Sequence, residues 1–262
     1  KRSQSIGDLS AVITGLLLAF NLPVSIPLWM VVIGSLVAIV VVKQFFGGIG
    51  QNFVNPALAG RIVLLTSFPV AMSTWTQPLT WTMSKLDGIT SASPLSSIHE
   101  MTSGGAAPDV SLVEMLIGWR AGCLGETCAV ALILGGIYLV VRKVISPTIP
   151  LTYIGTVAVI MLIAGKGDFR FVAYELLGGG LMLGAIFMAT DYTTSPITFK
   201  GKIIFGIGCG LITSIIRIFG NLPEGVSYSI IIMNILVPLI ENVTLPKPFG
   251  TPKKEKKEAE AK

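Results

Sequence analysis

The feature that most constrains this chain is a series of long apolar runs with almost no charged residue, such as residues 11–20, 28–42 and 129–141. Of its 262 residues, 52% are hydrophobic and 13% are charged, whereas about a quarter of the residues in a soluble domain are charged. A water-soluble fold of this size would lack the residues for a polar surface. The sequence therefore predicts a protein that crosses a membrane several times.

Glycine, proline and asparagine divide the apolar sequence into eight expected helices. They are expected at residues 8–21, 27–42, 54–72, 119–141, 148–165, 171–190, 202–219 and 226–241. Some are shorter than the roughly 20 residues that a hydrocarbon core requires. Glycine-rich or polar breaks precede the third and the last helix, at residues 47–52 and 219–225. Unwound backbone at membrane depth is stable only inside protein or along a cavity, so the breaks predict a binding site within the bundle.

The two breaks share one arrangement: a Phe-Gly pair, a turn, and then Asn and Pro within an apolar run. The residues are Phe46, Gly47, Asn55 and Pro56 in the first break, and Phe219, Gly220, Asn234 and Pro238 in the second. The pattern predicts an all-α, polytopic membrane helix bundle with an internal two-fold repeat and broken helices, with the site at the repeat interface. Two unrelated loops are the alternative.

The domain organisation follows from the one long polar stretch, at residues 73–117. Residues 1–72 are expected to form the first membrane helices, 73–117 a polar loop, 118–245 the second helical half and 246–262 a charged, disordered tail. With the loop outside, thirteen Lys and Arg residues fall inside and four outside, or seven against four without the tail. Basic residues favour the cytoplasmic side, which predicts a multi-pass protein of the cytoplasmic membrane with an extracytoplasmic loop and a cytoplasmic tail.

Several classes of function are disfavoured by the sequence. The net charge of +5 comes largely from the ends of apolar segments and the tail, which does not favour a nucleic-acid partner. We find no dinucleotide fingerprint, no iron–sulfur cysteine cluster and no Walker lysine loop, so NAD, ferredoxin and ATP chemistry is expected elsewhere. No metal site is expected. Cys123 and Cys128 would lie on different faces of a helix and are expected to be small buried residues, with a metal or redox role as the alternative.

No cleavable signal peptide is recognisable at the start of the chain. The basic residues Lys1 and Arg2 are not followed by the apolar core and small-residue cleavage site of such a peptide. We therefore expect the first apolar run to remain in the mature protein.

The polar loop contains a motif with small residues around two hydroxyls. It reads Asp87-Gly88-Ile89-Thr90-Ser91-Ala92-Ser93-Pro94. The motif resembles the flavinylation signal, which is an Asp, two residues, Ser or Thr, a small residue, Ala, and a final Thr or Ser joined to FMN through its phosphate. Ser93 is the expected attachment residue, with Thr90 as the fallback, although this position is usually Thr. The small side chains of Ser91 and Ala92 would let a transferase approach. A polar turn capped by Asp87 is the alternative.

The rest of the chain, from about residue 9 to about residue 240, resembles the D subunit of the Rnf complex and, more distantly, the B subunit of the sodium-pumping NADH:quinone reductase. The matching segments are Thr14-Gly15-Leu16-Leu17-Leu18-Ala19, Asn21-Leu22-Pro23, Lys43-Gln44-Phe45-Phe46-Gly47-Gly48, Asn52, Asn55-Pro56-Ala57-Leu58, Arg61, Gly122-Cys123-Leu124-Gly125-Glu126-Thr127, Phe187-Met188-Ala189-Thr190-Asp191 and Glu224-Gly225-Val226. Such subunits normally have two further helices upstream. An even number of additional helices leaves the expected orientation unchanged.

The resemblance implies a subunit of a membrane complex that passes electrons between reduced ferredoxin and NAD⁺, coupled to Na⁺ or H⁺ translocation. This subunit would carry covalent FMN for one-electron chemistry, and a second flavin such as riboflavin is a further expectation. Its partners would be the other membrane and peripheral subunits, including a second flavin-bearing subunit and iron–sulfur subunits, and a flavin transferase during maturation. The alternatives are a small-solute permease or channel, which also uses broken helices, and the quinone-reducing relative.

Polar residues within the apolar runs are the candidates for the remaining site. The resemblance favours flavin contact by Asn52 and Asn55 at a helix break, with polar repair of the backbone as the alternative. Arg61 can hold a flavin phosphate or carbonyl, or pair with Glu126. Glu126, near the start of an expected apolar helix, is a candidate for cofactor binding or for an ion or electron path, against an interfacial residue paired with Arg120.

Residues next to the expected helices and around the loop complete the candidates. Asp191, followed by hydroxyl side chains, is expected to cap the next turn, with an ion or electron path as the alternative. Trp75 and Trp81 flank the motif and are expected to anchor at the membrane interface, with flavin stacking as the alternative. His99 is expected to be a solvated loop residue.

Overall fold

The computed structural model describes residues 6–76, 90–91, 98, 110–220 and 224–246. Within these residues the fold is all-α, as predicted, apart from one antiparallel ladder between the two-residue strands β1 (Trp75–Thr76) and β2 (Thr90–Ser91). Two described helices are long and apolar enough to cross a membrane, α12 (Phe199–Phe219) and α13 (Val226–Thr244). A bent pair of shorter helices makes a third crossing if it is counted as one span.

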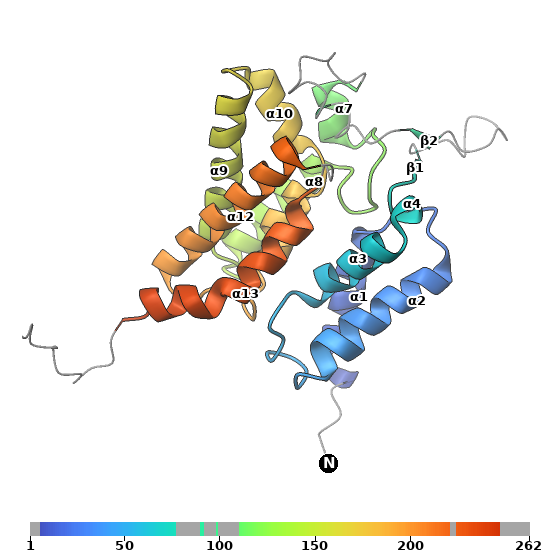
Figure 1. Ribbon diagram of the computed structural model, residues 1–262, viewed down its shortest axis with the longest axis vertical. Helices are drawn as coiled ribbons and strands as arrows, with labels where there is room; N and C mark the ends of the chain where they lie inside the picture. The colour runs from blue at the N-terminus through green and yellow to red at the C-terminus, as the bar shows by residue number, and fades with distance from the viewer. Residues whose placement is uncertain (1–5, 77–89, 92–97, 99–109, 221–223, 247–262) are drawn as a thin grey trace, which may run out of the picture.

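The other helices are shorter, and they form two groups (Figure 1). The first group contains η1 (Ile6–Asp8), α1 (Ser10–Phe20), α2 (Leu28–Leu36) with its π-helical continuation η2 (Val37–Gln44), α3 (Pro56–Ser67) and α4 (Pro69–Met72). The second contains α7 (Leu112–Ile117), α8 (Ala129–Val141), α9 (Thr148–Ala164), α10 (Phe169–Leu177), α11 (Leu181–Leu183) and η3 (Gly184–Met188). Helix α12 packs most extensively against α9, and α13 packs on both α12 and α3, which joins the two groups.

The start of α3 illustrates how local sequence sets a helix boundary. The side-chain oxygen of Asn55 accepts hydrogen bonds from the N–H groups of Ala57 and Leu58, at 3.1 and 3.2 Å. Pro56 follows at the first helical position, where an N–H would have no intrahelical partner. The asparagine predicted to mark a helix break is therefore the N-cap of α3.

The prediction of one helix over residues 119–141 is wrong at its start, because α8 begins only at Ala129. The preceding segment instead bonds to the turn after α1: the N–H of Leu124 donates to Leu22 O at 3.2 Å, and that of Gly125 to Phe20 O at 2.8 Å. A Cβ on Gly125 would collide with Phe20, so only glycine permits this approach. Cys123 and Cys128 therefore do not share a helix.

The expected helices at 171–190 and 54–72 are also interrupted. Helix α10 ends before three consecutive glycines, Gly179 has a left-handed φ of 60°, and the chain bends by 66° before it continues as α11 and η3. The second interruption falls at Phe68, before Pro69, which lacks the N–H needed to continue the ladder. Broken helices are therefore confirmed, with the sharpest bend at a glycine run that was predicted to be continuous helix.

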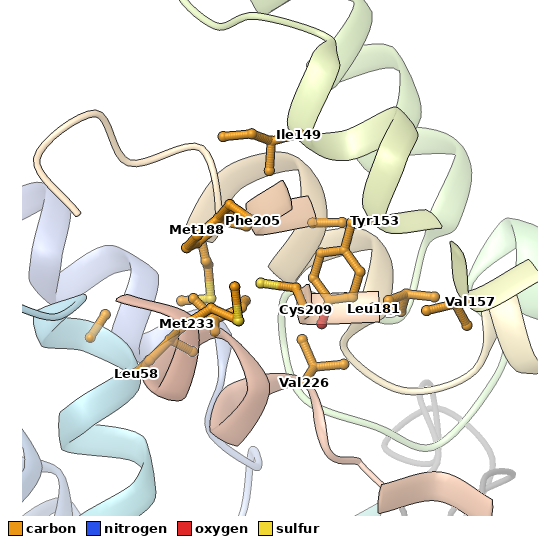
Figure 2. Close-up of a cluster of buried hydrophobic side chains, with 14 of the residues drawn as sticks. Leu58, Ile149, Tyr153, Val157, Leu181, Met188, Phe205, Cys209, Val226 and Met233 are labelled. Carbon is orange, nitrogen blue, oxygen red and sulfur yellow. The ribbon is translucent and has the colours of Figure 1, made fainter. Parts of the chain in front are cut away.

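The core joins α3, α9, α11, α12 and α13 (Figure 2). Tyr153 and Phe205 are its largest fully buried side chains. The Tyr153 hydroxyl is hydrogen-bonded to Thr213 Oγ1 at 2.6 Å and to Ser229 Oγ at 2.9 Å, so its polar group is satisfied inside the apolar core.

Candidate functional site

The flavinylation motif falls mostly outside the described residues, and that includes Asp87, Ala92 and Ser93. Two parts of the surrounding loop are described. The backbone of Thr90 and Ser91 forms strand β2, which pairs with β1 directly after α4. Ile98 is fully buried in the main core. The chain is therefore attached to the bundle two residues before Ser93 and five residues after it.

Trp75 packs against protein, and its predicted role as an interfacial anchor stays a prediction. Its side chain is buried against Ala121 and Cys123, in the segment before α8. This packing joins the beginning of the polar loop to the bundle by protein contacts, because the segment before α8 folds back as irregular chain. The expectations for Trp81 and His99 concern residues outside the described part of the chain.

A pocket of about 300 Å³ lies where the start of α1, the end of η2, the start of α3 and the end of η3 meet. We call it the asparagine pocket, because both predicted asparagines line it. Its polar lining comes from Ser10, Thr14, Lys43, Asn52, Asn55, Thr190, Asp191 and Thr193, and its apolar lining includes Ile13, Leu17, Leu139 and Phe187. Sequence reasoning thus found three of its polar residues, Asn52, Asn55 and Asp191.

Asn52 connects two separate segments at this pocket. Its amide nitrogen donates to Val54 O at 3.2 Å and to Thr193 Oγ1 at 3.1 Å. No hydrogen bond reaches its carbonyl oxygen from any described residue. Asn52 therefore repairs the backbone, which was one of its two predicted roles, and still offers an acceptor to a ligand in the pocket.

Asn55, in contrast, is fully used by the protein. Besides capping α3, its amide nitrogen donates to Met188 O at 3.2 Å. With its amide oriented to suit its neighbours, Asn234 accepts from the Asn55 N–H at 3.0 Å and donates to Ile230 O and Thr194 O, both at 3.1 Å. The two asparagines matched by the predicted repeat therefore meet, although Asn55 precedes its helix and Asn234 lies within α13. Of the two roles predicted for Asn55, the structure favours backbone repair.

The charged residues of the pocket are both held by hydroxyl groups. Lys43 is buried, and its Nζ donates to Thr14 Oγ1 at 3.3 Å. The Asp191 carboxylate accepts from the N–H of Thr193 at 3.2 Å and from the hydroxyls of Thr193 and Thr194 at 2.9 and 3.2 Å. This is the turn-capping role that was predicted for Asp191. Its part in an ion or electron path stays a prediction.

Arg61 does not line this pocket and belongs to a separate buried group of polar residues. Its guanidinium donates to Asn21 Oδ1 and Ser227 Oγ, both at 3.0 Å, and approaches Cys123 Sγ at 3.6 Å. It also forms an ion pair with Glu224. These residues, together with Glu126, are called the Arg61 cluster. The expected ion pair with Glu126 is wrong, because Glu224 takes that place.

Glu126 is 5% exposed and lies in the irregular segment before α8. One carboxylate oxygen accepts from the N–H of Cys123 at 3.1 Å, and the other has no hydrogen-bond partner among the described residues. Arg120 bonds the main-chain carbonyls of Glu126 and Thr127, at 2.5 and 3.3 Å, rather than the carboxylate. The expected pairing of the Arg120 and Glu126 side chains is therefore also wrong, and the interfacial position of Glu126 stays a prediction.

The Arg61 cluster has ligand atoms close enough together to hold a cation. Cys123 Sγ and one carboxylate oxygen each from Glu126 and Glu224 lie within 4.8 Å of one another. The Arg61 guanidinium already supplies positive charge at that point, through its ion pair with Glu224. Arg61 pairs with Glu224, so the Glu126 carboxylate has no ion pair among the described residues, and one of its oxygens is left to accept a further hydrogen bond.

A second buried ion pair stabilises the broken helix. Arg217 on α12 donates to the Glu175 carboxylate at 2.8 Å and to the main-chain carbonyls of Glu175 and Gly178, at 2.5 and 3.1 Å. It thus supplies donors to carbonyls at the end of α10, where the helical ladder stops. Both side chains are almost fully buried, at 1% and 4% exposure.

Sequence reasoning missed Glu175, Arg217, Glu224 and Lys43 as members of these networks. The signal was available in part, because an ionisable residue inside an apolar run is a functional or structural candidate by default. That rule was applied to Arg61 and Glu126 and applies equally to Glu175 and Arg217. It does not identify the partners, since these come from other helices.

The profile of the NQR2, RnfD, RnfE family matches residues 1–250 of the chain. The chain is 48% identical over 262 residues to the D subunit of the Na⁺-translocating ferredoxin:NAD⁺ oxidoreductase complex of Acetobacterium woodii, covering 100% of this chain and 79% of that protein. It is 44% identical to the D subunit of the proton-translocating ferredoxin:NAD⁺ oxidoreductase complex of Clostridium ljungdahlii, covering 94% and 76%. It is 39% identical to the D subunit of the ion-translocating oxidoreductase complex of Stutzerimonas stutzeri, covering 93% and 76%. The chain is therefore a member of the NQR2, RnfD, RnfE family of multi-pass membrane proteins.

Proposed function

We propose that this chain is the D subunit of an ion-translocating ferredoxin:NAD⁺ oxidoreductase and carries FMN covalently on its polar loop. The observation that supports this most directly is the chain's 48% identity over its full length to a protein of that name. In this proposal the chain lies in the cytoplasmic membrane, with residues 73–117 outside and the tail inside. It assembles with the other membrane and peripheral subunits, and a flavin transferase loads it.

Ser93 is the proposed attachment residue. The covalent flavin supplies the capacity to accept electrons and pass them on. The protein's contribution is to hold the loop: β2 pairs with β1 two residues before Ser93, and Ile98 is buried in the core five residues after it. These two attachments limit how far the chain around Ser93 can extend from the bundle.

Denaturing electrophoresis under ultraviolet light, followed by peptide mass spectrometry, tests the attachment. The natively expressed chain should give a fluorescent band and a mass increment of one FMN, less water, on the peptide that contains Ser93. Ser93→Ala should abolish the band, whereas the matched variant Thr90→Ala should keep it. A dark band from native protein, or an unmodified Ser93 peptide, contradicts the proposal.

We further propose that the asparagine pocket binds a second, noncovalent flavin such as riboflavin. Flavin rings have apolar faces and hydrogen-bonding edges, and the pocket offers Ile13, Leu17 and Phe187 beside polar groups of Asn52 and Thr190. Its volume of about 300 Å³ lies at the lower end for small-molecule sites. Asn52 has the role of an acceptor, since its amide nitrogen is engaged by the protein. Arg61 has no role in this binding, because it lies in the other cluster.

The transported ion is a separate part of the proposal. Glu126, with one unpartnered carboxylate oxygen, and Asp191, in the asparagine pocket, are the residues proposed to contribute to an ion or electron path. Na⁺ uptake into vesicles by the complex, driven by reduced ferredoxin and NAD⁺, is the measurement. Solute flux by the isolated chain without any flavin would instead support a permease, the alternative that broken helices also suit.

A further inference from the structure

An apolar groove of about 330 Å³ runs between α8 and α9. Its walls come from Ile133, Ile137 and Val141 on α8 and from Leu151 and Ile154 on α9, and Ile186 of η3 contributes to its floor. The wall residues of α8 span eight positions, or about 12 Å of helix at 1.5 Å per residue. The groove is therefore an elongated slot parallel to the helices.

The slot exists because both helices pack on a common neighbour. Helices α8 and α9 each contact η3. Gly136 of α8 lies so close to Ile186 that an added Cβ would meet its side chain at 2.7 Å. Small residues thus let α8 approach η3, and the space between α8 and α9 stays open on the surface. Ile137 and Leu151 on its two walls are 54% and 68% exposed.

Two cations stand at one end of the groove. Val141 and Ile145 line it, and Arg142 and Lys143 lie between them in the chain, both exposed. Neither side chain has an ion pair or a hydrogen bond with any residue that the structure describes. The apolar slot is therefore joined to a pair of uncompensated positive charges.

Lys143 occupies a position that normally favours glycine. It has a φ of +57° at the end of α8. Its N–H donates to Val140 O and the N–H of Val144 donates to Leu139 O, both at 2.9 Å, which is the pattern of a Schellman motif. Glycine adopts this conformation without strain, and lysine does not. The backbone turn therefore fixes the position of Lys143 at the end of the groove.

We propose that this groove binds one acyl chain of an anionic membrane phospholipid, whose headgroup phosphate contacts Arg142 and Lys143. The lipid tails of the bilayer are as apolar as the groove, so burial of the chain gives little selectivity. The charge of the headgroup sets the preference, because basic residues at a membrane surface attract anionic lipids. The negative charge of the headgroup thus determines which lipid binds, and the slot orients its acyl chain.

Lipid retention by the purified complex tests the proposal. The complex is exchanged into detergent containing equal amounts of phosphatidylglycerol and phosphatidylcholine, washed, and analysed by lipid mass spectrometry. Phosphatidylglycerol should be retained in excess. Arg142→Gln and Lys143→Gln should each lower that excess about fivefold, from the usual contribution of one basic residue at a membrane surface.

The Lys143→Gly variant distinguishes the effect of losing the lysine charge from the effect of a change in protein stability. It relieves the left-handed backbone and should raise the thermal midpoint slightly, yet it should lower phosphatidylglycerol retention as much as Lys143→Gln. The matched control is Lys166→Gly. Lys166 follows α9 with a φ of +53° and the same pair of backbone hydrogen bonds, from Lys166 N–H to Ile163 O and from Gly167 N–H to Leu162 O. It lies about 15 residues, or roughly 22 Å of helix, from Leu151 in the groove, and its variant should retain lipid normally.

Further measurements distinguish a phospholipid from a free phosphate as the ligand. Excess inorganic phosphate should leave phosphatidylglycerol retention unchanged, because a free phosphate lacks the chain that fills the slot. Full competition by phosphate would overturn the lipid assignment. Equal retention of the two lipids by the unaltered complex would also overturn it, and this is the result expected if another subunit covers the groove. An unchanged excess in the double variant Arg142→Gln/Lys143→Gln would exclude these two residues as the headgroup site.

Discussion

The Arg61 cluster and the asparagine pocket place polar groups inside the same bundle in opposite ways. In the cluster, the charged side chains of Arg61 and Glu224 form an ion pair. The Arg61 side chain also bonds residues from α13, the turn after α1 and the segment before α8. In the pocket, amides and hydroxyls line a space of about 300 Å³. In the cluster, the ion pair of Arg61 with Glu224 holds segments together, whereas in the pocket the Asn52 carbonyl oxygen has no partner among the described residues and is available to a ligand.

A line of polar contacts connects the two regions through Met188. Asn55 donates to Met188 O at 3.2 Å, Asn21 donates to Met188 Sδ at 3.5 Å, and Arg61 donates to Asn21 Oδ1 at 3.0 Å. All four residues are buried. A substitution in the Arg61 cluster can therefore affect the asparagine pocket, and the reverse, through residues in direct contact. Variants that affect only one of the two regions separate their roles.

The largest effect is expected where a charge pair has no access to water. Arg217→Met leaves the Glu175 carboxylate buried without its cation and should cost about 3–5 kcal/mol. Thermal unfolding of the purified complex, with the amount of assembled complex as a second readout, measures it. The double variant Arg217→Met/Glu175→Met should recover much of the loss, because it removes both charges. A double variant as unstable as the single one would show that the carbonyl contacts at the end of α10 matter more than the ion pair.

A smaller loss is expected at the pocket from Asn55→Leu. The substitution removes the N-cap of α3 and leaves the Met188 carbonyl with only the longer hydrogen bond from the Asp191 N–H at 3.5 Å, at a combined cost of about 2–3 kcal/mol. The destabilisation should appear in thermal unfolding as well. Asn55→Ser is the matched control, since its uncharged hydroxyl can cap the helix and it lacks the amide nitrogen that bonds Met188 O. Equal losses in the two variants would mean that the cap contributes little.

A variant of Asn52 tests ligand binding in the asparagine pocket, because the carbonyl oxygen of Asn52 is proposed to bind a ligand rather than the protein. Asn52→Ala should reduce noncovalent flavin occupancy about tenfold, the value of one hydrogen bond of roughly 1.4 kcal/mol. Acid precipitation releases noncovalent flavin for fluorescence measurement and leaves covalent flavin in the pellet as an internal reference. If the ratio of released to bound flavin is the same as in the unaltered complex, the pocket does not hold the second flavin.

The parts of the fold that follow from local rules were predictable. Apolar runs located the helices, with the expected helix at 54–72 beginning two residues before α3, and the hydroxyl residues after Asp191 located a capped turn. Each depends on residues within a few positions of one another. Composition and breaks therefore suffice to predict an all-α membrane bundle with broken helices.

Distant pairings were not predictable, because sequence pattern carries no information on which segments meet. Residues 119–128 were expected to extend a helix, yet the N–H groups of Leu124 and Gly125 bond to the end of α1 and the turn after it, over 100 residues away. Arg217 and Glu175 each stand alone within an apolar run, 42 positions apart. The charges could be recognised as candidates, but their partners depend on how α10 and α12 pack.

Glu114 gives the smallest effect and a reference for charges in water. It lies at the start of α7, where its carboxylate accepts from the Ser111 N–H at 2.8 Å and its own N–H donates to Ser111 Oγ at 3.2 Å. These hydrogen bonds hold the pKa of Glu114 below its usual value of 4.5. Since the folded pKa is depressed, the stabilisation is present above pH 4.5 and is lost as the pH falls through the folded pKa.

Amide exchange of Leu112–Ile117 in the intact complex should therefore accelerate, relative to the intrinsic rate, below pH 4.5. Glu114→Gln, which keeps an acceptor but cannot ionise, should remove the pH dependence. A dependence that survives in that variant would assign it to another group, and would weaken the contrast between this solvated cap and the buried pairs of the bundle.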